Sequence, residues 1–315
     1  MKLQKFFVNL LCAFVPVKKW RHSIRRHLFY DKFAGQNYVA LKQEWLARNG
    51  GKKLLPGRFE KYDLVFGIGA TCNVKTYLNF FELSKFTTPL DWTAGETVNG
   101  FWNQSRIYRD TKFSEKVKAL CNDFDGYYNP SDFYLRNKPM KDDIFHHMAE
   151  NIRTGISFVH SFPIEQSMEQ YMPTFIETMK RRSKRLIKAI KNSDKILIVW
   201  LHRVLDQIDV MDAPVTDAQI TDAIKRLSKK FPGKDIDFVF FENDGYKNRF
   251  EFEKCEISVP KIPNCRAYRV KSNHYILEPI YTYKYHFPGG RFGQPSLVIS
   301  EALDNISLTG KKIVD

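Results

Sequence analysis

Residues 62–81 have the sequence YDLVFGIGATCNVKTYLNFF, in which two kinds of pattern follow one another. The apolar run Asp63–Gly69 is closed by glycines, which is typical of a buried strand that ends in a turn. Apolar side chains then recur at helical spacing, namely Val74, Tyr77, Leu78 and Phe81. The segment therefore predicts a strand, a tight turn that carries Cys72, and a helix.

Strands and helices alternate through the rest of the chain. The further segments expected as strands are Gly155–Phe162, Lys195–Leu201, Ile236–Phe241 and a stretch near Arg266–Val270. The clearest helices are Glu169–Asn192, whose strongly basic face is expected to be solvated, and one that starts at Thr216 with a capping box to Gln219. Residues 94–150 are expected to form helices with irregular links. The pattern predicts an α/β fold with a mostly parallel sheet flanked by helices, and a papain-like α+β arrangement is the alternative.

Composition limits the class of protein and of partner. The chain has 315 residues, is 43% hydrophobic and carries a formal charge of +15, so it can bury a core and favours an anionic partner. Its five cysteines include no CxxC pair, which argues against a zinc ribbon and fits reduced thiols in the cytoplasm. No recognised nucleic-acid motif accompanies the charge, so we expect no nucleic-acid partner.

Residues 1–30 contain an apolar run from Phe6 to Val17 that is followed directly by basic residues. The run is too short to span a bilayer, and the basic flank argues against an exported signal peptide. We expect an amphipathic helix that lies on an anionic membrane surface; the alternative is a first helix packed on the body of the protein. The expected organisation is a membrane-surface segment at 1–30, a connector at 31–61 and one α/β domain at 62–315.

Cys72 is the best candidate for a chemical role, because it lies in a turn between a buried strand and a helix start. The amides and dipole at a helix N-terminus stabilise a thiolate, and the same amides could hold an oxyanion. Gly69 would permit close approach of a substrate, and Asn73 would add a side-chain donor. The alternative is that Cys72 is a small hydrophobic residue at a helix start.

A thiol nucleophile needs a base, which is usually a histidine. His160 is the best placed, on a predicted strand just before a proline-terminated loop, although a histidine in an apolar strand is more often a core residue. Asp91, between Leu90 and Trp92, could orient this base; the alternative is a structural carboxylate that backbone amides satisfy.

Further polar residues lie where a parallel sheet binds its ligands. His202 and Arg203 directly follow the strand Lys195–Leu201, and together with Trp92 they are candidates for substrate contact. No HExxH spacing occurs, and the glycine pair before Cys72 lacks the third glycine of a dinucleotide fingerprint, so we expect neither a metal nor a cofactor.

Three short motifs carry a family resemblance. They are Phe66–Val74 (FGIGATCNV), Pro89–Trp92 (PLDW) and Phe158–Phe162 (FVHSF). In this order they resemble a bacterial family of papain-like cysteine peptidases of uncharacterised function, over about residues 62–203. The resemblance implies a Cys72 nucleophile and a His160 base, with Asp91 in the family's Pro-Phe-Asp-Trp motif. Leu90 stands where that family has Phe, and Ser161 where it has Asp, so an orienting role for that Asp is absent here.

The start of the chain is also similar to bacterial proteins of surface-polysaccharide assembly, which act on the cytoplasmic face of the inner membrane. Two functions follow as expectations. One is a thiol-dependent hydrolase or acyl transferase, peripherally associated with the inner membrane, that acts on a peptide, acyl or glycan substrate. The other is a sugar transferase or accessory protein of glycan assembly in which Cys72 is structural. A membrane-surface adaptor without catalysis is a third possibility.

Overall fold

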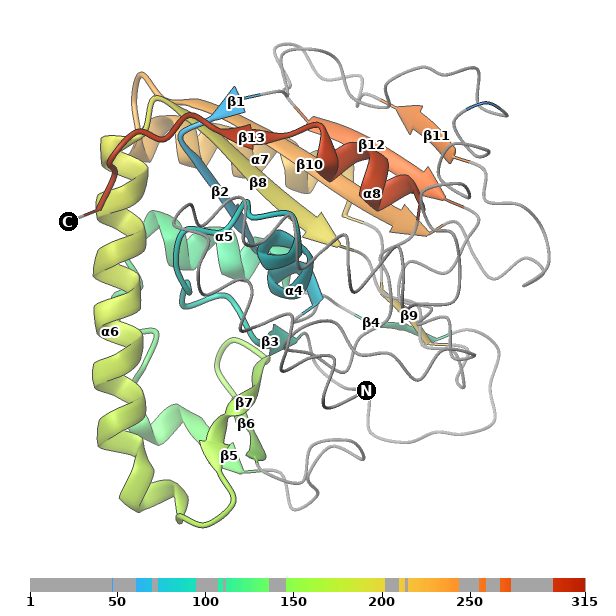
Figure 1. The fold of residues 1–315 in the computed structure, drawn as a ribbon. Coiled ribbons are helices and arrows are strands. Elements are labelled where there is room, and N and C mark those ends of the chain that lie inside the picture. The colour runs from blue at the N-terminus through green and yellow to red at the C-terminus, as the bar shows by residue number, and fades with distance from the viewer. Residues whose placement is uncertain are drawn as a thin grey trace, which may run out of the picture.

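The structure is a computed structural model, and it describes the greater part of the chain from residue 61 onward (Figure 1). The described residues are 47, 61–69, 73–94, 107–109, 112–135, 146–201, 210–212, 215–243, 255–258, 267–272 and 297–314. The predictions for residues 1–30, for most of the connector, and for Cys72, His202 and Arg203 lie outside these ranges.

A five-stranded sheet forms the centre of the molecule. Its strands are β2 (Leu64–Gly67), β8 (Lys195–Leu201), β10 (Asp235–Asn243), β11 (Cys255–Ser258) and β12 (Ala267–Ser272). They lie in the order β11-β12-β10-β8-β2, in which only β11 is antiparallel to its neighbour. Ile198 marks the register, because it pairs with Phe66 on one side and Phe238 on the other. The prediction of an α/β fold is confirmed.

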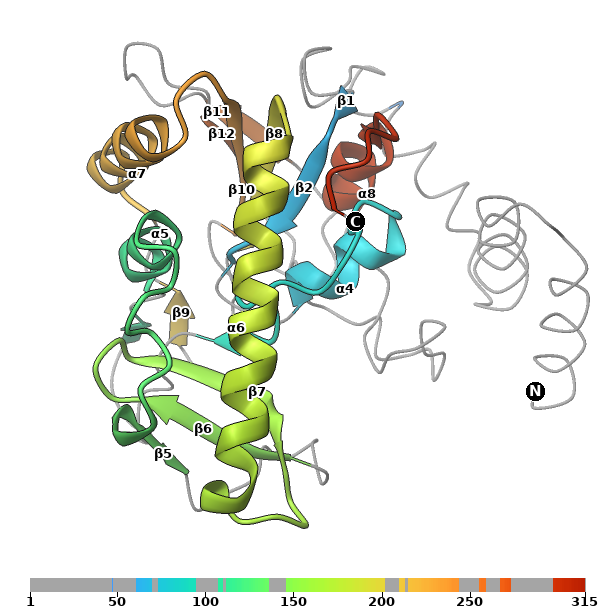
Figure 2. The same cartoon turned by 90° about the vertical axis from the view of Figure 1, so that its left-hand side faces the viewer.

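Helices cover both faces of this sheet. They are α4 (Asn73–Phe80), α5 (Phe113–Cys121), α6 (Met168–Asn192), α7 (Asp217–Lys230) and α8 (Leu297–Asp304). Figure 2 shows α5 and α7 on one side of the strands and α4 and α8 on the other, and α6 shares its core cluster with α5 and α7. Alternate side chains of β8 serve the two layers: Ile198 and Trp200 pack with α5–α7, whereas Val199 and Leu201 pack with α4 and α8.

The starts of α6 and α7 are encoded locally. Ser167 and Gln170 form a capping box at the start of α6, and Thr216 and Gln219 form the expected one at α7. The buried stripe of α6 includes Phe175, whose ring lies 4.6 Å from that of Phe162. None of the helices that the structure describes is both long and apolar enough to cross a bilayer.

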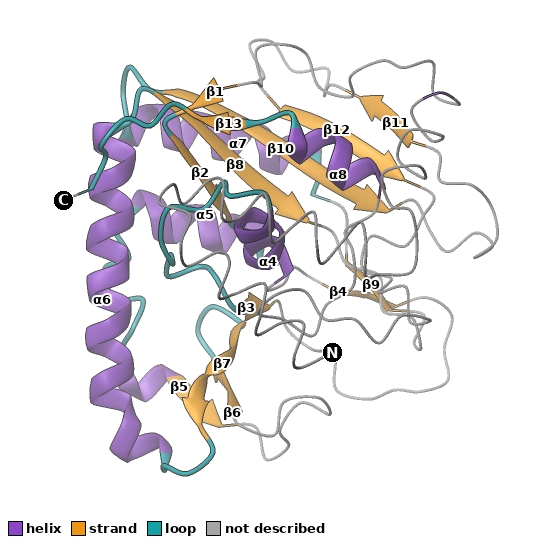
Figure 3. Cartoon of the chain, viewed as in Figure 1, coloured by secondary structure: helices purple, strands orange, loops and turns teal. Residues whose placement is uncertain are grey.

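The expectation of helices across residues 94–150 is wrong in part, because a second, antiparallel sheet begins there. Its strands are β3 (Thr93–Ala94), β5 (Phe133–Leu135), β6 (His146–Asn151) and β7 (Ile156–Pro163), in the order β3-β7-β6-β5 (Figure 3). β7 is the strand predicted at Gly155–Phe162, but its partners are antiparallel. Gly155, at φ 65°, makes the turn from β6 to β7. β5 and β6 are short and β6 carries a register shift, so neither shows the clear alternation that identifies a strand.

Smaller elements complete the described fold. They are β1 (Lys61–Tyr62) paired with β13 (Ser307–Leu308), β4 (Ile107–Arg109) paired with β9 (Val210–Asp212), and a short 3-10 turn at Pro130–Asp132. Both small pairs are parallel, and the first fixes the C-terminal residues beside the entry to β2.

Candidate functional site

The end of β2 and the start of α4 approach each other so closely that only glycine fits between them. A Cβ atom on Gly67 would overlap the side chain of Val74, and one on Gly69 would overlap Val74 and lie 3.0 Å from the backbone nitrogen of Leu201. The predicted strand and helix are therefore both present, and the glycines serve the close approach of α4 and β8. Cys72 precedes the first residue of α4 in the sequence and lies outside the described residues.

A buried ion pair connects α4 to the Pro89–Trp92 motif. The Nζ of Lys75 lies 3.3 Å from Oδ2 of Asp91, and the two side chains are only 5% and 3% exposed. Lys75 also donates a hydrogen bond of 2.6 Å to the carbonyl of Phe86, and Asp91 accepts one of 2.7 Å from the backbone N–H of Thr88. The loop that carries Asp91 is thereby held on the first turn of α4.

Burial dominates the protonation equilibria of this pair. Loss of solvent raises the pKa of Asp91 above its ordinary value, although the Lys75 charge and the Thr88 amide act in the opposite direction. Burial likewise lowers the pKa of Lys75, and the carboxylate of Asp91 only partly offsets this. The free energy of the pair is therefore sensitive to the removal of either partner.

Helix α6 contacts the same loop through Arg185 and places the guanidinium of Arg182 within electrostatic range of Asp91. Arg185 donates a hydrogen bond of 2.7 Å to the carbonyl of Thr87, and its guanidinium lies 4.9 Å from the ring centre of Phe86. Burial lowers the pKa of Arg182, while the negative charge of Asp91 opposes this shift. Asp91 thus lies where α4, its own loop and α6 meet, and its contacts with Lys75 and Thr88 fit the structural alternative stated for it above.

The Pro89–Trp92 motif also adjoins the strand that carries His160. Trp92 adopts a left-handed backbone conformation, with φ 62°, and its ring meets the imidazole of His160 edge-on at 5.7 Å. The next residue, Thr93, pairs with Phe158 of β7. His160 is half-buried and also lies edge-on to His146, at 5.9 Å. A left-handed tryptophan is strained, and the conformation directs its ring onto the histidine.

The structure thus brings together Gly69, Asp91, Trp92 and His160 through a chain of contacts among β2, α4, the 81–92 loop and β7. Asn73 is described only as the first residue of α4. Gly69 lies against the backbone of Leu201, so the turn after β2 and the end of β8 share one edge of the sheet. His202 and Arg203 come directly after Leu201 in the sequence.

Lys116 is a residue near the site that the sequence analysis missed. Its side chain, from α5, is fully buried, and its Nζ donates a hydrogen bond of 2.6 Å to the carbonyl of Gly69. The same nitrogen lies 5.6 Å from the ring centre of Trp200. The sequence pattern that could have identified Lys116 is its place within an apolar stripe at helical spacing, formed by Phe113, Val117 and Leu120. Lys116 therefore places its ammonium group beside Gly69, which lies three residues before Cys72 in the sequence.

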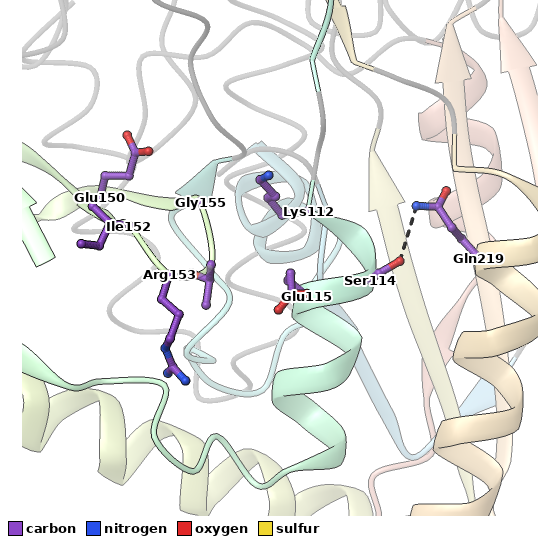
Figure 4. A pocket seen from close by; sticks show the side chains of 9 residues that line it. Lys112, Ser114, Glu115, Glu150, Ile152, Arg153, Gly155 and Gln219 are labelled. Atoms are coloured by element: carbon purple, nitrogen blue, oxygen red, sulfur yellow. Dashed lines mark hydrogen bonds between the residues drawn. The ribbon is translucent and has the colours of Figure 1, made fainter. Parts of the chain in front are cut away.

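A polar cavity of about 470 Å³ lies at a different place, between the β6–β7 turn and the starts of α5 and α7 (Figure 4). The residues that line it are Lys112, Ser114, Glu115, Glu150, Ile152, Arg153, Thr154, Gly155 and Gln219. Gly155 precedes β7, and His160 lies five residues further along that strand. The cavity is therefore separate from the contacts of His160.

Among the residues that the structure describes, no group of three or more His, Cys, Asp or Glu side chains could hold a metal ion. Comparison of the chain with protein-family models, with curated proteins and with solved structures gave no match.

Proposed function

We propose that the protein is a thiol-dependent hydrolase or acyl transferase of the papain-like kind, with Cys72 as nucleophile and His160 as base. One observation carries the proposal: the Pro89–Trp92 segment adjoins both the helix that follows Cys72 and the strand that holds His160. Lys75, on the helix that begins directly after Cys72, pairs with Asp91, and Trp92 beside Asp91 contacts His160. These contacts join residues far apart in the sequence.

In the proposed reaction, the imidazole of His160 takes the proton of the Cys72 thiol, and the thiolate attacks a substrate carbonyl carbon. Amides at the start of α4 stabilise the oxyanion. The imidazolium then returns the proton to the leaving group, which leaves an acyl group on the sulfur. Water or a second acceptor, deprotonated by His160, releases this acyl group and restores the thiol.

The remaining candidate residues have supporting roles in this proposal. Asp91 is a positioning residue that holds its loop on α4, and Trp92 sets the orientation of the imidazole. Asn73, His202 and Arg203 are the proposed substrate contacts, whereas Gly69 is buried and admits the side chain of Val74. The protein acts on a peptide, acyl or glycan substrate at the cytoplasmic surface of the inner membrane, to which residues 1–30 attach it.

Covalent trapping tests the nucleophile directly. The full chain is treated with acyl-mimicking electrophiles, such as peptide vinyl sulfones and activated acyl esters, and the modified cysteine is identified by mass spectrometry. We expect one adduct, on Cys72, that is absent in Cys72→Ser and strongly reduced in His160→Ala. Cys121 is the internal control, because burial raises the pKa of its thiol. Equal labelling of Cys72 and Cys121 would refute the proposal.

The polar cavity favours a second candidate function, a sugar transferase or accessory protein of surface-glycan assembly. Its volume is in the range of ligand sites, about 300–1,000 Å³. Lys112, Ser114 and Gln219 supply hydrogen-bonding groups, and Arg153, which pairs with Asp132 at 2.9 Å, lies beside them. The lining also includes the carboxylates of Glu115 and Glu150. This candidate predicts binding of sugar nucleotides that survives Cys72→Ser and is weakened by Arg153→Ala. Isothermal titration with both variants distinguishes the two functions.

A further inference from the structure

The C-terminal half of α6 presents a row of positive charges to solvent. We call the α6 cationic face the exposed side chains of Lys180, Arg181, Lys184, Lys188 and Lys191. At 3.6 residues per turn these five positions fall within about 100° of arc and extend over about 17 Å of the helix. Figure 2 shows α6 along the outside of the molecule, with this half beside the central sheet.

No acidic residue interrupts the α6 cationic face in the sequence. Residues 178–193 contain seven Lys or Arg residues and no Asp or Glu. Arg182 and Arg185 are half-buried and Arg185 contacts the Asp91 loop, which leaves five exposed cations on the outer face. Glu177 is exposed one turn before the row, and Asp194, which pairs with Lys311 at 2.6 Å, follows it. The outer surface of α7 differs, because Asp217 and Asp222 alternate with its cations.

The excess charge of the whole chain is concentrated in two segments. Residues 1–30 carry seven Lys or Arg and no acidic residue, and residues 178–193 carry the same number. The other 269 residues hold 36 Lys or Arg against 35 Asp or Glu, so they are nearly neutral. A formal charge of +15 is thus a property of two short segments and not of the general surface.

We propose that the α6 cationic face docks the protein on an anionic lipid bilayer. This inference rests on the membrane-surface part of the proposed function and is independent of its chemistry. A flat surface of phospholipid headgroups suits these cations, because they lie on one face of a single helix. A single-stranded nucleic acid fits less well, since residues 178–193 include no aromatic side chain on which a base could stack.

Vesicle flotation of the full chain tests the inference. The vesicles consist of phosphatidylcholine with or without phosphatidylglycerol. The test variant is Lys180→Gln/Lys184→Gln/Lys191→Gln. The matched control is Lys118→Gln/Lys225→Gln/Lys229→Gln, which removes the same charge from exposed positions of α5 and α7. We expect the test variant to bind phosphatidylglycerol vesicles about a hundredfold more weakly than wild type, and the control to bind within a few-fold of it.

Circular dichroism and thermal melts establish that both variants are folded. Equal losses in the test and control variants would show an effect of total charge and would overturn the α6 inference, while the membrane part of the proposed function would survive. Failure of wild type to bind anionic vesicles would overturn both. Binding of wild type to single-stranded RNA but not to vesicles would also refute the proposal, because it would identify a different anionic partner.

Discussion

Two buried lysines hold the candidate site together at the scale of single residues. Lys75 joins α4 to Asp91, and Lys116 joins α5 to the carbonyl of Gly69. A buried ammonium group is costly without partners, so each lysine fixes the groups that surround it. The partners lie 16 and 47 residues away in the sequence, and for this reason sequence patterns alone could not identify them.

Replacement of Lys75 should destabilise the protein in a pH-dependent manner. Lys75→Met leaves the carboxylate of Asp91 buried without its cation, at a cost of about 3–5 kcal/mol of unfolding free energy. The loss of Lys75 raises the pKa of Asp91 further, so the native state holds a proton to higher pH than the unfolded state does. Stability conferred by a raised carboxyl pKa is lost as pH rises through the folded value. Urea unfolding should therefore show a larger cost at pH 8 than at pH 5.

The control for that experiment is Lys118→Met, which removes an exposed lysine from α5. It should change the unfolding free energy by less than about 0.5 kcal/mol at either pH. If Lys75→Met costs the same unfolding free energy at pH 5 and at pH 8, the protonation of Asp91 does not change between these pH values, which would contradict the prediction.

Lys116 should favour the thiolate of Cys72 if its ammonium charge lies beside the nucleophile. Cys72 is the third residue after Gly69, so even a fully extended chain places the two charges within about 16 Å. At an effective dielectric constant of about 20 their attraction is about 1 kcal/mol, or about 0.7 of a pKa unit. We expect Lys116→Met to raise the midpoint pH of Cys72 alkylation by at least this amount, and Lys118→Met to leave it unchanged. An unchanged midpoint in Lys116→Met would exclude an electrostatic role.

At the scale of secondary structure, the contact between β2 and α4 determines where the nucleophile segment begins. The side chain of Val74 occupies the space that a Cβ on Gly67 would need. Gly67 and Gly69 therefore allow one helix to pack closely on the end of one strand. Neither glycine has a left-handed backbone conformation, so the close approach and not a turn requires them.

Gly67→Ala should destabilise the protein by about 1–3 kcal/mol, because the new methyl group overpacks a filled space. Val74→Ala removes the side-chain atoms that the new methyl group at position 67 would strike. The double variant should therefore be more stable than the sum of the two single changes predicts. Thermal or urea unfolding of the four proteins measures the coupling. Strict additivity would show that α4 moves away from β2 and that the contact is not tight.

Elements with strong local signals were predictable from the sequence, and elements fixed by distant partners were not. β8 is a continuous apolar run, and α6 and α7 combine an apolar stripe with a capping box, so their sequences specify them. β6 begins with two histidines and carries a register shift, and its strand conformation depends on pairing with β7. For the same reason the sequence showed β7 as a strand but gave no sign that its sheet is antiparallel.

At the scale of the whole molecule, Asp63 fastens two distant segments to the start of the central sheet. Its carboxylate accepts hydrogen bonds from Thr309 Oγ1 at 2.6 Å and from the backbone N–H groups of Asp194 and Lys195 at 2.8 and 3.2 Å. Burial alone would raise the pKa of Asp63, but these hydrogen bonds and the charge of Lys311 outweigh it, and the pKa is lowered.

A lowered pKa makes Asp63 a source of acid sensitivity. The stability that it confers is present above its unfolded pKa of about 3.9 and is lost as pH falls through the lower folded value. We expect Asp63→Asn to reduce stability near pH 6 by about 1.5–3 kcal/mol, and to lose less stability than wild type between pH 5 and pH 3. Asp125→Asn, at an exposed position, is the control. Parallel pH profiles of wild type and Asp63→Asn would contradict this assignment.

The pH dependence of Cys72 alkylation by iodoacetamide tests the proposed thiol–imidazole pair most directly. The rate is followed at Cys72 by mass spectrometry in wild type and in His160→Ala, with Cys121 as the internal reference. We predict a midpoint clearly below the free-thiol value of about 8.5 in wild type, and a return toward that value when His160 is removed. An ordinary midpoint that His160→Ala leaves unchanged would contradict the assignment of Cys72 and His160 as nucleophile and base.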